Sequence, residues 1–289
     1  MRKPLISVIT PSYNQACFIE QTIASVIGQS YDNIQFIIVD GGSTDGSLDI
    51  IKKYSSNLFY WTSEPDSGQS DAINKGLKKA TGDLVTWINS DDLLLPGSLQ
   101  AIADAWMKSP SASLFSGDCI RIDPDNKYLS CHVVPPQLGW FSKKGLVYID
   151  QPGTFWRRDL IQTDEGLDTA LHTVMDHDLW YRITLQYKNA LRLNRCLAAF
   201  RLHDKSKTAN IQEIFIKEAN IIREKHCGGR KQISFTTLLS YRFLKTINGN
   251  YFRQYILSNF PPREIQTFLL DLRREYSPNI DCHHRKKLI

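Results

Sequence analysis

The chain has 289 residues, of which 42% are hydrophobic and 22% charged, with a formal net charge of +5. This length suits one large domain, or one domain with a smaller appendage, and the composition is that of a globular protein rather than a disordered or fibrous one. The first residues lack a secretory signal pattern, and no apolar run approaches the roughly 20 residues that span a bilayer. We therefore expect a cytoplasmic protein, with peripheral attachment to the inner face of the cell membrane left open.

The charge is unevenly distributed along the chain. Residues 204–289 contain 16 basic and 8 acidic residues, a net charge of +8, whereas the remainder has 19 against 22, a net charge of −3. A basic segment can attract a membrane surface or a phosphate-bearing partner, or it can consist of solvated helix faces. The basic residues are spread over several predicted helices and no recognition motif is present, so we expect no nucleic-acid partner.

Residues 1–110 alternate between strand and helix patterns. Continuous apolar runs predict buried strands at residues 5–10, 35–39, 58–62 and 84–88, the first one stopped by Pro11. Helical spacing predicts helices at residues 16–28, 69–80 and 97–107, and a further helix that runs through Tyr54 with Ser43 or Thr44 as its N-cap. This alternation predicts an α/β fold with a mostly parallel sheet flanked by helices on both faces.

The pattern changes after residue 110. Short strands are expected at residues 113–134, a helix at 174–187 and two short strands at 190–202. From Ala209 to Tyr276 the spacing is helical and is interrupted at residues 228–229, 248–249 and 261–262. We therefore expect a helical C-terminal extension, residues 209–289.

Four polar clusters follow the four predicted strands: TPSYN, DGGSTD, SEPDSG and NSDD. Ligands of parallel α/β sheets bind beyond the carboxyl ends of the strands, so these clusters are expected to meet at one crevice. The DGGSTD loop is neither a P-loop nor a G-x-G-x-x-G loop, which argues against a dinucleotide site.

Four acidic residues could carry chemistry. Asp91 and Asp92 could hold a divalent cation with a diphosphate, or they could cap a helix. Asp40 could accept hydrogen bonds from a base or ribose, or could close a turn. Asp176 could serve as a general base, or could complement the dipole of the helix that it opens.

The order of these motifs resembles a known family. ISVITPSYNQACFIEQTIASVIGQSYDNIQFIIVDGGSTDGS, EPDSGQSDAINKGLKKATGDLVTWINSDDLLLPGSL and the later QPGTFWRRDL, MDHDLWYRI and FRLHDKS are similar to inverting family-2 glycosyltransferases of the GT-A fold. The resemblance covers roughly residues 4–208 and is closest to the branch of bacterial surface-polysaccharide synthesis. It implies a glycosyltransferase domain at residues 1–208, with a donor-binding half at 1–110 and an acceptor and catalytic half at 111–208.

The resemblance also implies roles for individual residues. The donor, with a UDP-sugar favoured, would be bound by Pro11, Tyr13, Asp40, Asp66, Gln69, Lys75, Asn89 and Asp91. A divalent metal, Mn²⁺ or Mg²⁺, would be held by Asp91 with His203 nearby. Asp176 would be the catalytic base, and Gln151 and Trp156 would lie near a glycan or lipid-linked saccharide acceptor. Asn89 departs from the pattern, because many members carry the first aspartate of D-x-D there.

Other interpretations remain open at this point. A sugar nucleotidyltransferase, or another metal-dependent nucleotide-using enzyme, could share the crevice, and a non-catalytic nucleotide-sugar binder would not need Asp176. The C-terminal Tyr251, Phe252, Tyr255 and Ile256 could rest on a membrane surface or pack against their own domain.

Overall fold

The computed structural model describes residues 2–135, 139–146, 149–161, 166–187, 189–204, 212–229 and 233–276. Its first half follows the predicted alternation. The strands β1 (Ile6–Ser12), β2 (Ile34–Asp40), β3 (Tyr60–Ser63) and β4 (Leu84–Trp87) are parallel, in the spatial order β3-β2-β1-β4. They alternate with the helices α1 (Ile19–Ile27), α2 (Ser47–Lys53), α3 (Gln69–Lys79) and α4 (Ser98–Lys108).

The second half continues the same sheet with mixed directions. Strand β8 (Thr154–Arg157) lies antiparallel between β4 and β6 (Leu114–Ile122), and β9 (Ala190–Arg201) runs parallel to β6. The short β5 (Leu93–Leu94) and β7 (Tyr128–His132) pair antiparallel with β9 and β6. Helices α5 (Gly139–Lys143) and α6 (Met175–Gln186) complete this half. The two predicted halves, residues 1–110 and 111–208, therefore share one sheet.

Three local predictions were wrong. Pro11 lies inside β1, opposite Val39, because the pairing of β1 with β4 has already ended at Ile9 and a missing N–H interrupts no ladder there. Helix α2 starts at Ser47 after Gly46, whose φ of 98° is left-handed, so neither Ser43 nor Thr44 caps it. Residues 190–201 form one strand of 12 residues rather than two, and irregular pairing with β6 near Asp118 absorbs the break.

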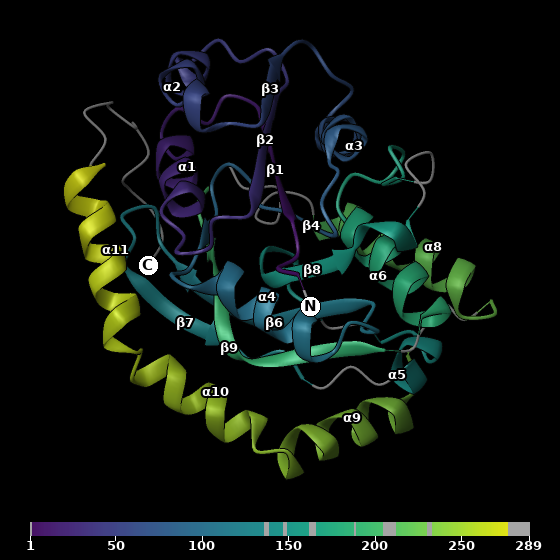
Figure 1. Ribbon diagram of the computed structural model, residues 1–289. Helices are drawn as coiled ribbons and strands as arrows, with labels where there is room; N and C mark the ends of the chain where they lie inside the picture. The colour runs from purple at the N-terminus through teal and green to yellow at the C-terminus, as the bar shows by residue number, and fades with distance from the viewer. Residues whose placement is uncertain are drawn as a thin grey trace.

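Helices cover both faces of the sheet (Figure 1). On one face α3 and α6 bury Ile73 and Leu179 against side chains such as Ile9 of β1. On the other, α1 and α4 bury Ile23 and Ile102 against alternate strand residues. This is the two-period pattern of strand side chains and explains why the central strands are apolar throughout.

The C-terminal helices α8 (Gln212–His226), α9 (Phe235–Ile247), α10 (Asn250–Asn259) and α11 (Arg263–Glu275) confirm the predicted helical extension. In Figure 1 the last three run along the outside of the molecule in yellow-green, from α5 past β7 toward α1. Helix α8 packs on α6, and α11 buries Ile265, Leu269 and Leu272 in a third apolar cluster. None of the described helices is long and apolar enough to cross a membrane.

Candidate active site

The carboxyl ends of β1, β2 and β3 lie side by side, as predicted. Ser12 is opposite Asp40, and Asp40 is opposite Ser63, so the three polar loops leave the sheet from one edge. Gly41 N donates to Ser12 O at 2.8 Å, and Glu64 N donates to Asp40 O at 3.0 Å. The backbone alone thus joins the first three clusters.

Side chains hold these loops in one conformation. Asn14, at a left-handed φ of 52°, accepts from Thr44 N at 2.9 Å, while its own N donates to Ser43 Oγ at 2.8 Å. Asp45 accepts from Ala16 N at 2.9 Å and from Ser47. Loop positions fixed by so many hydrogen bonds present a preorganised surface.

Asp40 is placed differently from the expectation. Its side chain is fully buried and accepts hydrogen bonds from Gly42 N, Ser43 N and Ser63 Oγ. A carboxylate with these partners and no exposed surface shapes the loop beneath a ligand rather than contacting a base or ribose directly. The turn-closing alternative therefore describes Asp40 in this structure.

Asp66 lies directly against the second loop. A Cβ on Gly41 would stand 2.6 Å from Asp66 Oδ2, so only glycine leaves space for this carboxylate. Asp66 Oδ1 accepts from Gly68 N at 2.8 Å, which fixes the turn that starts α3. Asp66 is half-buried and Tyr13 is 62% exposed, so both are accessible on the same loop edge.

A cavity of about 790 Å³ opens beside the fourth cluster. Four of the predicted site residues line it: Gln69, Asn89, Gln151 and Asp176. Gln69 Nε2 donates to Asn89 Oδ1 at 2.7 Å, which joins the start of α3 to the end of β4. Gln151 Nε2 donates to Trp87 O at 2.6 Å, whereas its Oε1 is buried without a hydrogen-bond partner in the described structure.

Asp91 and His203 lie together, as predicted. His203 Nε2 is 2.9 Å from Asp91 Oδ2, and the imidazole packs on Phe18 with ring centroids 4.9 Å apart. The neighbouring Leu202 lines the cavity, so the pair borders it. No group of three or more acidic, histidine or cysteine residues able to hold a metal occurs in the described part of the chain. A carboxylate and an imidazole still suit a cation that completes its shell with phosphate oxygens.

Asp92 does not join this pair. It is fully buried, accepting from Arg201 N at 2.9 Å and from Asn89 Nδ2 at 3.2 Å. Burial and the neighbouring Asp91 carboxylate raise the pKa of Asp92 well above its usual range. Asp92 therefore fixes the loop that carries Asp91.

Arg201 is a central residue that the sequence did not reveal. Its buried guanidinium donates to Asp91 O at 2.7 Å and to Gln21 Oε1 at 2.9 Å, and lies 4.8 Å from the centre of the Phe18 ring. Burial lowers the pKa of Arg201 to about 10, so it stays charged at neutral pH. The pattern FRLHDKS contained Arg201, but nothing in it signalled burial.

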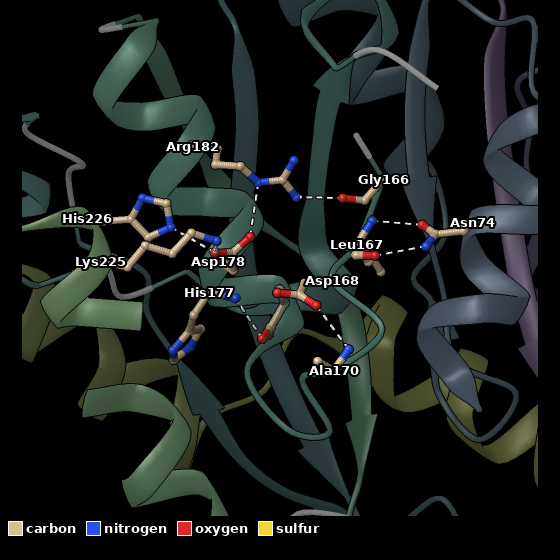
Figure 2. A network of polar contacts seen from close by, with 11 residues as sticks. Asn74, Gly166, Leu167, Asp168, Ala170, His177, Asp178, Arg182, Lys225 and His226 are labelled. Atoms are coloured by element: carbon tan, nitrogen blue, oxygen red, sulfur yellow. Dashed lines mark hydrogen bonds and ion pairs between the residues drawn. The ribbon is translucent and has the colours of Figure 1, made fainter. Parts of the chain in front are cut away.

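Helix α6 carries two acidic residues in different environments. Asp176 lines the cavity, and its Oδ1 accepts from His177 N at 2.8 Å. Asp178, two residues later, is buried and is contacted by His226 at 2.7 Å, Arg182 at 3.0 Å and Lys225 at 3.1 Å. Figure 2 shows these three side chains converging on Asp178 from α6 and α8. Asp176 is therefore free for chemistry, whereas Asp178 is structural.

Trp156 is buried away from the expected acceptor position, whereas the expected contact of Lys75 with the donor stays a prediction. Trp156 is 1% exposed and packs edge-on against Trp87 and Trp180, so it supports the cavity wall from behind and does not reach an acceptor. Lys75 Nζ lies 3.2 Å from Glu64 and 3.5 Å from Asp71, so its charge is already paired.

Comparison with known proteins fits this geometry. The model of the family described as "Glycosyl transferase family 2" matches residues 7–163. The protein TuaG of Bacillus subtilis (strain 168), whose name assigns it to teichuronic acid biosynthesis, is 31% identical over 214 residues, 72% of this chain and 83% of TuaG. The chain belongs to glycosyl transferase family 2.

Solved structures show the fold of this family-2 chain. A fragment of TarS of S. aureus, solved in complex with UDP-GlcNAc, has a TM-score of 0.61 at 16% identity, over 94% of this chain and 80% of that one. A mannosyltransferase of Pyrobaculum calidifontis, solved with GDP-Man and Mn²⁺, has a TM-score of 0.54 at 17% identity, over 97% of this chain and 77% of that one. This family-2 chain is thus a glycosyltransferase with the predicted GT-A-like α/β fold. The alternative interpretation as a nucleotidyltransferase is therefore rejected.

Proposed function

We propose that this glycosyltransferase transfers a sugar from a UDP-sugar to a hydroxyl of a glycan or lipid-linked saccharide, with inversion at the anomeric carbon. The observation that carries the proposal is the cavity itself, which is lined both by Asn89 from the donor half and by Asp176 from the acceptor half. The names of TuaG and the UDP-GlcNAc complex of TarS support a cell-envelope polysaccharide and a UDP donor.

The donor would bind across the edge formed by the first three loops. Tyr13 and Asp66 would contact the base and ribose, while Asp40 and Pro11 would hold the loops from below. Lys75 would position Glu64 and Asp71 around the donor loop. The diphosphate would then lie toward Asp91, next to the cavity.

Asp91 and His203 are the residues that would hold a divalent metal, Mn²⁺ or Mg²⁺. Asn89 offers an amide and no second carboxylate. Its amide group already accepts a hydrogen bond from Gln69 and donates one to Asp92. When bound, such a metal supplies neutralisation of the charge that develops on the leaving diphosphate. Imidazole ligation favours Mn²⁺ over Mg²⁺, so we propose that Mn²⁺ is the better cofactor.

The acceptor would enter the cavity from the side of Gln151. The unpartnered Oε1 of Gln151 can accept a hydrogen bond from a sugar hydroxyl. Asp176 then takes the proton of the attacking hydroxyl, its Oδ1 being held by His177 N and its position in the first turn of α6 favouring the anion. A single displacement of UDP from the anomeric carbon inverts its configuration. We place this reaction in the cytoplasm, at the inner face of the cell membrane.

A thermal-shift screen tests the donor class. Nucleoside diphosphates and their sugars are compared with and without Mn²⁺, in the native protein and in Asp91→Asn. A ligand at 100 times its Kd adds about 2.7 kcal/mol of stability, which raises Tm by several degrees for a chain of this size. The expected result is stabilisation by UDP or a UDP-sugar that depends on Mn²⁺ and is lost in Asp91→Asn. Equal responses to all nucleotides, with or without metal, would contradict the proposal.

A further inference from the structure

Helix α9 presents a row of large apolar side chains to solvent. Phe235, Leu239, Phe243 and Ile247 are four residues apart and are 58–77% exposed. This spacing places them along one side of the helix, whose opposite side packs on the protein. An uninterrupted stripe of this kind is unusual on a surface that contacts only water.

Helix α10, which follows α9 directly, also exposes large apolar side chains. Its exposed large side chains are Tyr251, Phe252, Tyr255 and Ile256, followed by Phe260. Helix α10 itself is fixed to the sheet, because Arg253 Nη2 lies 2.9 Å from the buried Asp118 and Tyr128 donates to Leu257 O. These apolar side chains of α9 and α10 are called the α9–α10 surface below. Other side chains of the two helices contact the protein, Tyr241 from α9 and Arg253 from α10, so these apolar side chains are left facing solvent.

The charge of this segment is entirely positive. No aspartate or glutamate occurs between Glu224 and Glu264, whereas Lys225, Arg230, Lys231, Arg242, Lys245, Arg253 and Arg263 do. Of these, Arg242 is exposed on α9 and has no ionic partner in the described structure. The α9–α10 surface therefore combines exposed aromatic and aliphatic groups with the exposed cation Arg242, and neither helix contains an acidic residue.

We propose that the α9–α10 surface docks on an anionic lipid surface. Phenylalanine and leucine side chains enter the boundary between headgroups and acyl chains, tyrosine remains at the headgroup level, and basic side chains attract the anionic phosphates. A second copy of the chain is a poorer occupant, because it would bring another Arg242 and no acidic residue of α9 or α10 to pair with it. Helices α9 and α10 lie along the outer edge of the molecule in Figure 1, where a flat partner can reach them.

The surface also adjoins the wall of the cavity. Tyr241 of α9 packs edge-on against Phe141 of α5, with ring centroids 5.8 Å apart, and Leu146 just after α5 lines the cavity. Docking would therefore hold the acceptor side of the cavity close to the lipid. This binding is independent of the transfer reaction and can be measured without a donor or an acceptor.

Vesicle co-sedimentation of the full chain tests the proposal. The probes are vesicles of phosphatidylcholine alone and vesicles with equal parts of phosphatidylglycerol. We expect pelleting with the anionic vesicles, weakened by salt, and a loss of at least about tenfold in apparent affinity in Phe235→Ser/Phe243→Ser. Arg242→Glu should weaken binding to the anionic vesicles more than to the neutral ones.

Matched variants on another face serve as controls. Phe59→Ser removes a phenylalanine that is 56% exposed before β3, and Lys108→Glu reverses an exposed charge on α4. Both should pellet as the native chain does, and circular dichroism checks that every variant is folded. Equal pelleting of all variants, or no pelleting at all, overturns the proposal. So does a native dimer in analytical ultracentrifugation that Phe235→Ser/Phe243→Ser makes monomeric. Loss of donor binding with vesicle binding intact would contradict only the proposed transfer reaction.

Discussion

Asp176 and Asp178 show how much the surroundings of a single residue decide. Both carboxylates lie in the first turn of α6, where the helix dipole favours either of them. Of the two, only Asp176 lines the cavity. Asp178 instead contacts Arg182 on its own helix and Lys225 and His226 on α8. The sequence predicted Asp176 from its place in the MDHDLW pattern, but spacing alone could not separate it from Asp178.

Replacing Asp176 tests its role as base. Asp176→Asn should lower kcat by about 10²- to 10⁴-fold, because the amide cannot take the proton of the acceptor hydroxyl. UDP affinity should be unchanged, since Asp176 lies on the acceptor side. Kinetics on an extract containing acceptor, together with UDP calorimetry, provide the measurement. Asp168→Asn, a change at an exposed carboxylate just before α6, is the control and should keep full turnover. Comparable turnover in both variants would reject the assignment.

Helix α6 is anchored by the Asp178 cluster. Burial raises the pKa of Asp178, but hydrogen bonds from His226 and Lys225 and the Arg182 charge outweigh it and lower the value from 3.8 to about 2. Because the folded-state pKa is depressed, this carboxylate adds stability above pH 3.8 that is lost as the pH falls toward 2. The contribution is about 2 kcal/mol.

Asp178→Asn tests this contribution. We expect a loss of about 2–4 kcal/mol in the free energy of unfolding at pH 7, because Arg182, Lys225 and His226 lose the buried carboxylate that they contact. The difference between native and variant should narrow as the pH falls from 5 to 2, where the native Asp178 also becomes neutral. Urea unfolding across this range measures it. Asp159→Asn, at an exposed pair with Arg157, should cost less than about 1 kcal/mol at any pH. A difference that stays constant down to pH 2 would refute the linkage.

The elements of residues 1–110 could be predicted to within a few residues, because buried parallel strands and amphipathic helices leave strong local patterns. The exact starts and ends of the helices and strands were less predictable. The N-cap position of α2 is Gly46 rather than Ser43 or Thr44, and Ser43 N donates to Asp40 instead. The single long β9 was missed because its irregular pairing with β6 depends on residues about 75 positions away.

At the scale of the whole molecule, Arg201 connects four distant segments. Its guanidinium reaches Gln21 on α1, Asp91 after β4 and Asn126 before β7, while Arg201 itself ends β9. The sequence near each partner gives no sign that it contacts Arg201. A local pattern therefore cannot predict that these segments meet. For the same reason the sequence predicted Asp91 and His203 as a pair only through family resemblance, whereas the fold brings them together through Arg201 and Asp92.

Arg201→Met keeps an unbranched side chain that reaches about as far as Nε, but it removes every donor of the guanidinium. It should cost about 3–5 kcal/mol in the free energy of unfolding, because buried acceptors on three segments lose their partner. Arg195→Met, at an exposed arginine on the same strand that donates to Pro96 O, should cost less than about 1 kcal/mol. Denaturant titration of both variants makes the comparison, and equal midpoints would show that Arg201 does not organise the site.

The central claim is that one edge of the sheet binds a nucleotide diphosphate and a cation beside the Asp176 cavity. A crystal structure with UDP and Mn²⁺, measured at the manganese absorption edge, tests it most directly. We predict an anomalous peak about 2.0–2.6 Å from a carboxylate oxygen of Asp91, with the diphosphate beside it and the uridine against Asp66. A nucleotide bound away from this edge, or a cation with no contact to Asp91, would contradict the account.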